Sequence, residues 1–552
     1  MRLRLAALVA AAAVASALVP HVRSAQPPPA TAPSRPRLVV FVSVDQMRFD
    51  YLTRFGPLFK GGFRKLLDRG AVFSGARFRH AVTETGPGHS VLLSGRSPAH
   101  SGIVGNEWFD ALLGREVNVV ADPTVTAVGG AGRGASPANF IGFTVGDMLK
   151  ARTPRSRVVG VSVKDRSAIL MAGPRADAAY WLDYGSGAVV TSTYYMSSAP
   201  PWLDRLNGRR LPETLGARPW TRLLPDEKAY QEHAGADDVE GEWDRVHTTF
   251  PHRARGAPPS WEFYEDFRRT PFADELVLEM ALEVLAAHEM GTDDDTDLLA
   301  VGFSAADGIG HTFGPDSQEV MDHFLRLDLM LDRLLAEAGR RAGPEGVLVG
   351  LSADHGALPL VEVLRARGVP ARRAHPSVLQ AAVAAALDAR FGAGHGFVAH
   401  YLPPDFYLDL AGIERRGLAR REVEAAVEKA LLGTGIVEKV YTHERMLGPQ
   451  PPGDTSFPFV RRSFFQPRSP HVITVLDPWV YLSSRPGGTG HGTLRDHDRH
   501  VPVVFLGPGI APGTYPEACG PEDIAPTLAS LLGLEYPMQD ATRVLTEMTR
   551  AD

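Results

Sequence analysis

Short, continuous hydrophobic runs recur along the chain and predict buried β-strands. The runs are rich in β-branched residues and lack the alternation of apolar and polar positions found in half-exposed strands. This pattern is typical of parallel strands that are covered on both faces of a sheet. The runs occupy residues 38–44, 158–163, 298–303, 347–351 and 503–506.

Helical patterns separate these runs. Apolar residues recur three to four positions apart over residues 271–288, 317–338 and 522–532. The first of these segments carries Asp274 and Glu275 in its first turn, where acidic side chains interact favourably with the helix dipole. The alternation of strands and helices predicts an α/β fold with three layers, in which helices cover both faces of a mostly parallel central sheet.

Two long stretches interrupt this alternation. Residues 173–270 are rich in Trp, Tyr, Pro and Arg and show no clear periodicity. Residues 365–485 have a pattern of their own, which predicts an extended segment at 406–410, a helix at 421–432 and an extended segment at 437–441. Because the polar motifs described below lie on both sides of these stretches, we interpret both as insertions that cover the sheet of one domain spanning residues 37–552, and not as free domains.

The N-terminal segment has the layout of a secretory signal peptide. Arg2 and Arg4 precede an apolar run over residues 5–19, which is followed by small residues and then by a proline-rich stretch. The apolar run is shorter than the ~20 residues needed to cross a bilayer. We therefore assign residues 1–25 to a signal peptide and 26–36 to a linker, and we expect a periplasmic or secreted mature protein without a membrane span.

Composition and charge narrow the possible functions. Hydrophobic residues make up 44% of the 552 residues, which is enough for a large core and excludes a disordered chain. The formal net charge of -6 argues against a broad nucleic-acid interface, which requires a basic face. A single cysteine, Cys519, excludes a disulfide framework, so any bound metal must use histidine and carboxylate ligands. We expect a monomer that acts on small molecules.

Polar residues follow four of the predicted strands. In open α/β sheets, ligands bind at the carboxyl ends of the strands. One aspartate after a strand is commonly a turn residue, but four polar clusters at four strand ends predict a shared crevice. These clusters are Asp45, then Lys164-Asp165-Arg166, then Asp307, and finally Asp354-His355.

Histidines and carboxylates in these clusters have the composition of a metal centre. Asp307 and His311 stand four residues apart in what we predict to be a tight glycine-rich turn. His491 has glycine neighbours, which allow close approach of the backbone. Two sets of three ligands would each leave an open coordination position, as in catalytic zinc sites. The candidate ligands are Asp45, Asp307, His311, Asp354, His355 and His491.

Thr85 is the candidate nucleophile. It lies in Thr83-Glu-Thr-Gly-Pro-Gly-His89, directly before a helical run, where backbone N–H groups and the helix dipole favour a phosphate group. A threonine hydroxyl needs activation, which a bound Zn²⁺ can supply by lowering its pKa. The structural alternative is an ordinary threonine at the N-terminus of a helix.

An ordered set of short motifs resembles that of the alkaline phosphatase superfamily. The set is most similar to the phosphate-irrepressible bacterial alkaline phosphatases with a threonine nucleophile, which are related to the type I phosphodiesterases and nucleotide pyrophosphatases. The resemblance extends over residues 38–534 and weakens inside the two insertions. Its motifs are Val44-Asp45-Gln-Met-Arg-Phe-Asp-Tyr51, Thr85-Gly-Pro-Gly-His89, Gly102-Ile-Val-Gly-Asn106, Lys164-Asp-Arg166, Asp307-x-x-x-His311, Ala353-Asp-His-Gly356 and Gly490-His-Gly492.

The resemblance implies a role for each candidate residue. One Zn²⁺ would be held by Asp45, Asp354 and His355 and would activate Thr85, which is itself a ligand. A second Zn²⁺ would be held by Asp307, His311 and His491 and would stabilise the leaving-group oxygen. Contacts to the nonbridging phosphoryl oxygens would come from Asn106, Lys164 and Arg166. The resemblance thus implies an exported two-zinc alkaline phosphatase that hydrolyses phosphate monoesters through a phosphothreonine.

Two alternatives remain open at this point. A type I phosphodiesterase or nucleotide pyrophosphatase would use the same two-zinc site, although such enzymes typically lack the Lys164–Arg166 pair because one oxygen of a diester carries a second substituent. A non-catalytic periplasmic protein that binds metal or phosphate has no need of a nucleophile, so Thr85 argues against it.

Overall fold

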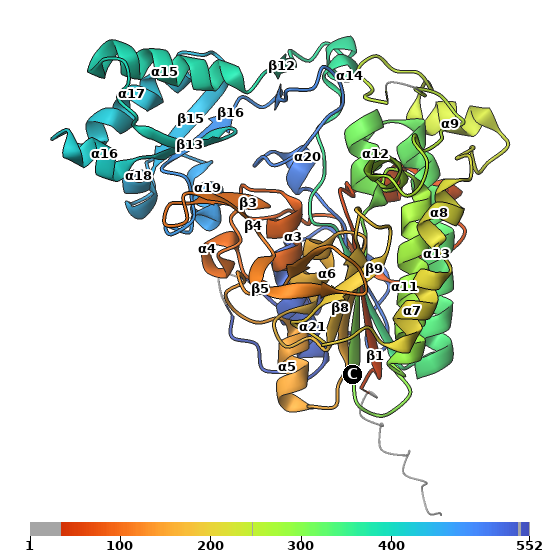
Figure 1. The fold of residues 1–552 in the computed structure, drawn as a ribbon. Coiled ribbons are helices and arrows are strands. Elements are labelled where there is room, and N and C mark those ends of the chain that lie inside the picture. Colours follow the sequence, from red (N-terminus) through yellow and green to blue (C-terminus); the bar gives the residue numbers. More distant parts are fainter. Residues whose placement is uncertain (1–34, 245–246, 539–541, 551–552) are drawn as a thin grey trace, which may run out of the picture. The chain divides into compact units, whose positions relative to one another are not determined.

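A single large β-sheet forms the centre of the protein (Figure 1). The structure is a computed structural model that describes residues 35–244, 247–538 and 542–550; the assigned signal peptide and most of the linker lie outside these residues. Within this part of the chain, eleven strands make up the sheet. In spatial order they are β19 (Gly513–Tyr515), β2 (Ala71–Phe73), β18 (Val503–Leu506), β11 (Val347–Ser352), β1 (Leu38–Val44), β10 (Asp297–Phe303), β7 (Val158–Ser162), β8 (Ala178–Leu182), β9 (Val189–Ser192), β5 (Ala121–Val128) and β6 (Arg133–Ala135).

The middle of this sheet is parallel, as the continuous apolar runs predict. Strands β11, β1, β10, β7 and β8 pair in parallel, and every residue of β1 and β10 is buried. Ser43 pairs with Ser352 and Val44 with Phe303, so the strands end at one common edge. The prediction was wrong for the run at 503–506, because β18 pairs antiparallel with β11. A strand buried on both faces has the same apolar pattern in either direction, so only the connections fix its direction.

Helices cover both faces of the sheet, which confirms the predicted α/β fold class. On the right in Figure 1 lie α11 (Pro271–Ala287) and α13 (Gln318–Ala342), which pack against each other. The other side carries α3 (Thr85–Leu92), α5 (Val145–Arg152), α6 (Asp165–Ala172) and α21 (Ile524–Leu531). Shorter helices are α1 (Asp50–Arg54), α2 (Gly62–Arg69), α4 (Pro98–Ser101), α14 (Val361–Ala366) and α20 (Asp496–Arg499). Every helix among the described residues is too short or too polar to cross a membrane.

The stretch 173–270 contributes in part to the central sheet. Its first two strands, β8 and β9, extend the sheet beyond β7, so the sheet does not end where this stretch begins. The rest forms short helices, of which α8 contacts α11 and α9 contacts α13. These helices are α7 (Pro201–Gly208), α8 (Leu211–Gly216), α9 (Glu227–Ala234) and α10 (Trp261–Phe267).

The stretch 365–485 has its own sheet and its own hydrophobic cluster. The predicted segments at 406–410, 421–432 and 437–441 correspond to β14 (Asp405–Leu408), α17 (Arg420–Leu432) and β15 (Val437–Thr442). Strands β14 and β15 pair with β16 (Val472–Leu476), and β13 (Val398–Leu402) completes this sheet, on which α15 (Ser377–Phe391) and α17 share a core. The remaining elements are β12 (Arg372–Ala374), β17 (Val480–Leu482), α16 (Leu410–Arg415), α18 (His443–Leu447) and α19 (Phe457–Ser463).

The stretch 365–485, which we call the cap, contacts a hairpin that follows Asn106. The hairpin consists of β3 (Glu107–Asp110) and β4 (Arg115–Asn118). The ring of His400, from β13, stacks on Phe109 with 4.9 Å between ring centres, and its Nε2 lies 2.7 Å from Glu116 Oε1. Arg468 donates to the carbonyl oxygens of Gly102 and Asn139. The cap is therefore fixed to the segments on either side of Asn106.

The loop at residues 241–244 connects the first inserted stretch to the core and contains a buried acid. Trp243 N donates to Thr312 O, and Gly241 O accepts from Gly488 N. Both carboxylate oxygens of Glu242 are buried and have no hydrogen-bond partner in the part of the chain that the structure describes. Burial and the nearby carboxylate of Glu319 raise the pKa of Glu242 from 4.5 to about 10. The Glu242 carboxyl group therefore stays protonated at neutral pH.

This buried acid makes the folded state less stable as the pH rises. Above pH 4.5 the carboxyl group of Glu242 ionises in the unfolded chain but keeps its proton in the folded one, so the free energy of unfolding falls as the pH rises toward 10. We predict that Glu242→Gln, a neutral isostere, raises the thermal midpoint at pH 9 and changes it much less at pH 5. Thermal unfolding at both pH values measures this difference.

Glu240→Gln is the matched control, because Glu240 is exposed and two residues away. Its thermal midpoint should follow that of the wild type at both pH values. An equal effect of Glu242→Gln at pH 5 and pH 9 would contradict the assignment of a protonated buried acid.

Candidate active site

The polar residues that follow the central strands meet at one edge of the sheet. Asp45 directly follows β1, and Asp354 and His355 follow β11. Asp307 lies in α12 (Ala305–Phe313), directly after β10. Because these strands are parallel and in register, their ends bring the side chains together across large distances in sequence. The polar side chains that follow these strands thus lie close together, as the sequence predicted.

Asp45, Asp354 and His355 form the first group of potential metal ligands. His355 Nε2 lies 3.5 Å from Asp45 Oδ1 and 3.3 Å from Asp354 Oδ2, and all three side chains are buried. Burial and the neighbouring Asp354 raise the pKa of Asp45 well above its usual value. Burial lowers the pKa of His355 to about 3, so its imidazole is neutral, as metal binding requires.

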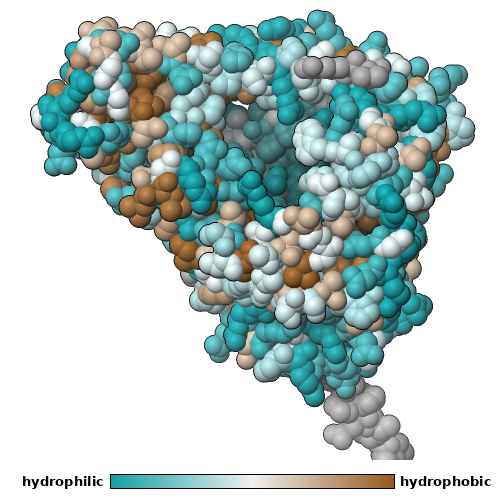
Figure 2. Space-filling view, in the orientation of Figure 1, coloured by the Kyte–Doolittle hydropathy of each residue, from teal (hydrophilic) through white to brown (hydrophobic). Residues whose placement is uncertain are grey.

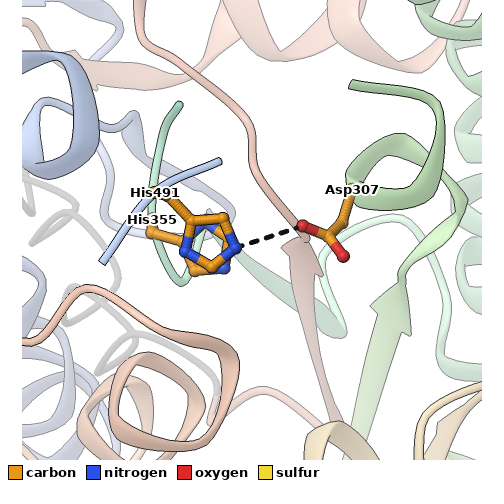
Figure 3. A group of neighbouring side chains, drawn as sticks. All are labelled: Asp307, His355 and His491. Atoms are coloured by element: carbon orange, nitrogen blue, oxygen red, sulfur yellow. Dashed lines mark ion pairs between the residues drawn. The ribbon is translucent and has the colours of Figure 1, made fainter. Parts of the chain in front are cut away.

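Asp307, His311 and His491 form the second group, with His355 at its border. Asp307 Oδ1 lies 3.1 Å from His311 Nε2 and 3.5 Å from His491 Nε2. Figure 3 shows the Asp307 carboxylate facing the ring of His491, which overlies that of His355 with 3.5 Å between ring centres. The ligand atoms of Asp307, His355 and His491 all lie within 4.8 Å of one another. The tight cluster in the structure thus contains His355 where the prediction has His311, and His311 lies beside it, next to Asp307.

The local structure around Asp307 differs from the predicted glycine-rich turn. Asp307 and His311 lie on helix α12, where a spacing of four residues places them on one face. The two histidine rings are oriented by backbone carbonyls: His311 Nδ1 lies 2.7 Å from Thr489 O, and His491 Nδ1 lies 2.7 Å from Thr83 O. These contacts direct Nε2 of each ring toward Asp307. Such support is typical of histidines that bind metal.

The donor atoms of the first group fit a divalent cation. Asp45 Oδ1, Asp354 Oδ2 and His355 Nε2 are buried, and although histidine nitrogens lie 3.1–3.5 Å from the two carboxylate oxygens, no contact among the described residues has hydrogen-bond geometry at these three atoms. Buried polar atoms without partners are costly, and a bound cation would satisfy all three. Imidazole and carboxylate ligands suit zinc and similar metals.

Lys164 lies between the two groups. Its Nζ is 2.6 Å from Asp45 Oδ2 and 2.7 Å from Asp307 Oδ2, and it is 3.5 Å from Thr85 Oγ1. Burial lowers the pKa of the Lys164 ammonium, but Asp307 and Asp45 outweigh burial and raise it. The ammonium group therefore stays charged and neutralises part of the carboxylate charge beside Thr85.

Thr85 and Asn106 are held together at the start of α3. Thr85 is the first residue of this helix and is almost fully buried. Gly86 N donates to Asn106 Oδ1 at 2.7 Å, and Asn106 N donates to Glu84 Oε2 at 2.8 Å. Because its oxygen is engaged in this way, the side-chain NH₂ group of Asn106 can donate to a group placed at Thr85.

Arg166 lines a cavity beside these residues. It lies in the first turn of α6, and its Nε is buried and has no hydrogen-bond partner within residues 35–244, 247–538 and 542–550. The cavity has a volume of about 500 Å³ and is also lined by Lys164, Arg133 and Trp261. Figure 2 shows a hollow with hydrophilic walls between the regions that Figure 1 labels α12 and α20. The lining of the cavity is mixed in charge, since Asp165, Asp183 and Glu265 line it as well, but Lys164 and Arg166 place two cationic groups at the end next to Thr85.

Two further residues contact the ligand groups and were not singled out from the sequence. His89 Nδ1 lies 3.1 Å from Asp354 Oδ2. Gln46 donates through its side chain to Asp307 Oδ1 and through its backbone N–H to Asp354 Oδ1. Both residues lie inside the motifs quoted above: His89 is four residues after Thr85, and Gln46 directly follows Asp45. The signal that could have found them was their position, one helical turn from the candidate nucleophile and next to a candidate ligand.

Comparisons with known proteins agree with this architecture. A sequence profile of the type I phosphodiesterase / nucleotide pyrophosphatase family matches residues 39–500. The alkaline phosphatase PafA of Elizabethkingia meningoseptica is 33% identical over 523 residues, which cover 93% of this chain and 94% of PafA. The alkaline phosphatase PhoV of Synechococcus elongatus is 32% identical over 522 residues, which cover 94% of each chain.

Solved structures of PafA also match this chain in fold. The crystal structure of wild-type PafA matches with a TM-score of 0.88 at 33% identity and covers 94% of this chain and 100% of its own. A PafA variant substituted at a threonine, an asparagine, a lysine and an arginine matches with a TM-score of 0.87 at 32% identity, with the same coverage. Fold and sequence together define a member of the alkaline phosphatase superfamily. The chain belongs to its type I phosphodiesterase / nucleotide pyrophosphatase family.

A buried aspartate from a neighbouring helix supports the segment that carries Asp307. Asp274, in α11, accepts hydrogen bonds from the backbone N–H groups of Ser304 and Ala305, where α12 begins. Its Oδ2 also lies 3.3 Å from His323 Nε2 in α13. Asp274 therefore satisfies N–H groups that the start of a helix leaves unpaired.

Loss of this carboxylate should destabilise the protein. We predict that Asp274→Ala lowers the free energy of unfolding by about 1–3 kcal/mol, because buried N–H groups lose their acceptor. Asp274→Asn keeps an acceptor oxygen and should lose clearly less. Urea unfolding of both variants measures the difference, and equal losses would show that the acceptor is not what stabilises this helix start.

Proposed function

We propose that the protein is an exported, two-zinc alkaline phosphatase that hydrolyses phosphate monoesters through a phosphothreonine at Thr85. The observation that carries the proposal is the pairing of a helix-start threonine with Lys164 and Arg166 beside two groups of histidine and carboxylate ligands. Export rests on the N-terminal segment, which predicts a periplasmic or secreted enzyme, and the catalytic domain spans residues 37–552 with its two inserted stretches over the site.

The two ligand groups would each hold one Zn²⁺. Asp45, Asp354 and His355, with Thr85, would hold one ion, while the other would be held by Asp307, His311 and His491. When bound, the ions supply positive charge at the attacking and leaving oxygens of an in-line displacement and lower the pKa of the threonine hydroxyl. The three unpartnered donor atoms of the first group support this assignment.

The protein's own residues bind and orient the ester. The deprotonated Thr85 Oγ1 attacks phosphorus, the bond to the leaving alcohol breaks, and the alcohol departs with a proton from solvent. The Asn106 NH₂ group and the Arg166 guanidinium donate to the nonbridging oxygens, and the planar guanidinium can hold two of them. Attack of water on the phosphothreonine then releases phosphate and restores the Thr85 hydroxyl. Lys164 balances the negative charge that the carboxylates and the phosphoryl group bring together.

The alkaline phosphatase relatives support the same four residues. The PafA variant whose structure resembles this one is substituted at a threonine, an asparagine, a lysine and an arginine. Thr85, Asn106, Lys164 and Arg166 follow in the same order, and in both chains the asparagine lies 21 positions after the threonine and the arginine two positions after the lysine. This agreement supports a joint role of these residues here.

The site also bears on the two alternatives. A diester carries a second substituent on one of its nonbridging oxygens, so a diesterase has less use for two cations on that side of the site. Lys164 and Arg166 therefore favour a monoesterase. A protein that only binds metal or phosphate would not need a buried threonine hydroxyl 3.5 Å from a lysine ammonium.

One prediction of the proposed function concerns the nucleophile. Thr85→Ala should abolish turnover, because no other hydroxyl occupies its position at the start of α3, while the six other ligands should keep two zinc ions per chain. Acid-quenched reactions with a radioactive monoester should label the wild type only, and elemental analysis should count two zinc ions in both proteins. Label on Thr83 or Ser90 would place the nucleophile elsewhere, and a wild type active without metal would contradict the zinc assignment.

The second prediction concerns the choice between monoesters and diesters. Arg166→Ala leaves the carboxylates and Lys164 in place and removes one charge-assisted contact, which costs on the order of 2–4 kcal/mol, or roughly 30- to 1000-fold in rate. We expect this loss in kcat/KM for p-nitrophenyl phosphate and a far smaller loss for bis-p-nitrophenyl phosphate, whose phosphoryl group carries less charge.

Arg133→Ala is the matched control for this experiment. Arg133 lines the same cavity and is exposed, so its removal takes away one positive charge without a phosphoryl contact. It should change neither substrate's kcat/KM by more than a few-fold. Similar losses on both substrates in Arg166→Ala would withdraw the claim of a dedicated monoesterase and leave a phosphohydrolase of broader range.

A further inference from the structure

Gln46 has an unusual backbone conformation next to a proposed metal ligand. It follows Asp45 directly after β1, has a φ angle of 62° and is 1% exposed. Residues other than glycine rarely adopt this left-handed conformation, and such residues gather at functional sites where the surrounding structure holds them. The conformation therefore needs a compensating interaction.

The two ends of Gln46 contact the two ligand groups separately. Its backbone N–H donates to Asp354 Oδ1 at 3.1 Å, in the first group. Its side-chain Nε2 donates to Asp307 Oδ1 at 2.8 Å, in the second group. One residue thus holds a carboxylate of each group, over sequence separations of 308 and 261 residues.

The opposite side of the contact is also adapted to Gln46. A Cβ atom at Gly310 would lie only 1.9 Å from Gln46 Oε1, so α12 can approach Gln46 this closely because position 310 is glycine. Asp307 and His311 flank this glycine on the same helix. The left-handed turn at 46 and the missing side chain at 310 together place the Gln46 amide against the Asp307 carboxylate.

This carboxylate is the one whose orientation matters most for the second group. Asp307 Oδ1 accepts from Gln46 and also faces His311 Nε2 and His491 Nε2, while Oδ2 faces Lys164. Without Gln46, the carboxylate would be held by Lys164 on Oδ2 and by the two imidazoles alone on Oδ1, which are the groups that a bound metal ion would engage. The amide therefore keeps Oδ1 turned toward the two imidazoles.

We propose that Gln46 is a positioning residue that sets the metal affinity of the Asp307–His311–His491 group by orienting Asp307, while its backbone holds Asp354 in the other group. The inference rests on the proposed function, since it concerns zinc at that site. Gln46 is not itself a ligand: it acts through Asp307. Groups that hydrogen-bond to metal ligands commonly change metal affinity by roughly 10- to 100-fold.

Gln46→Gly is the direct test. Glycine accepts the left-handed backbone and keeps the N–H that binds Asp354, but it removes the amide from Asp307. In competition with a zinc chelator, we expect one of the two zinc ions to be released at a roughly 10- to 100-fold lower chelator concentration, while the second is released as in the wild type. Gln46→Asn, which tolerates the same backbone but is too short to reach Asp307, should behave in the same way and serves if the glycine variant does not fold.

A double variant shows which ion is affected. His311→Ala removes a ligand of the second group, so adding Gln46→Gly to it should cause no further loss of affinity for the zinc that remains. A purely structural role would weaken both ions and would add to the effect of His311→Ala. That result, or wild-type affinity for both ions in the Gln46 variants, would overturn the inference. A wild type that binds no zinc would instead overturn the proposed function.

Discussion

Three buried carboxylates at one edge of the sheet set the main electrostatic constraint of this protein. Asp45, Asp307 and Asp354 are nearly inaccessible to solvent, and like charges in such surroundings repel strongly. The ammonium of Lys164 contacts two of these carboxylates, and its single positive charge cannot neutralise all three. A phosphate monoester would add two further negative charges. Two divalent cations would make the net charge of the site positive, so that the site could bind an anion.

The rest of the fold holds these groups in place. Parallel strands in register bring Asp45, Asp307 and Asp354 to one edge, and helix starts present Thr85 and Arg166 to the same space. Support comes from outside the cluster, through the carboxylate of Asp274 at the start of α12 and through backbone carbonyls that orient the histidines. The chemistry therefore depends on contacts made by residues that no substrate touches.

The sequence predicted the scaffold well because its signals are local. The continuous apolar runs located the central strands to within a residue or so, and the ordered motifs located polar residues that the structure brings together at one edge of the sheet. It could not predict the direction of β18, since burial on both faces leaves the same pattern in either direction. It also missed β8 and β9 at the start of the stretch 173–270, because strands of five and four residues are too short to show a clear period.

Contacts between residues that are distant in the sequence were the other feature that could not be predicted. Nothing in the local pattern distinguishes Gln46 from any polar residue after a strand, because its role depends on where Asp307 and Asp354 come to lie. The sequence motif singled out Asn106, but it did not indicate that the amide oxygen of Asn106 accepts from Gly86 N, 20 residues away. The glycines around Asp307 suggested a turn, whereas tertiary packing made them part of a helix.

The contact between Gly241 and Gly488 has a consequence for efforts to shrink the enzyme. Gly241 O, in the first inserted stretch, accepts from Gly488 N, and Thr489 N in turn donates to His311 O. The loop that ends in His491 is therefore shaped by a segment from elsewhere in the chain. A minimal core cut free of the inserted stretches would keep all six candidate histidine and aspartate ligands in its sequence but would lose a backbone contact that positions the loop ending in His491. Trimming this protein should therefore spare residues 241–244 and the loop that ends in His491.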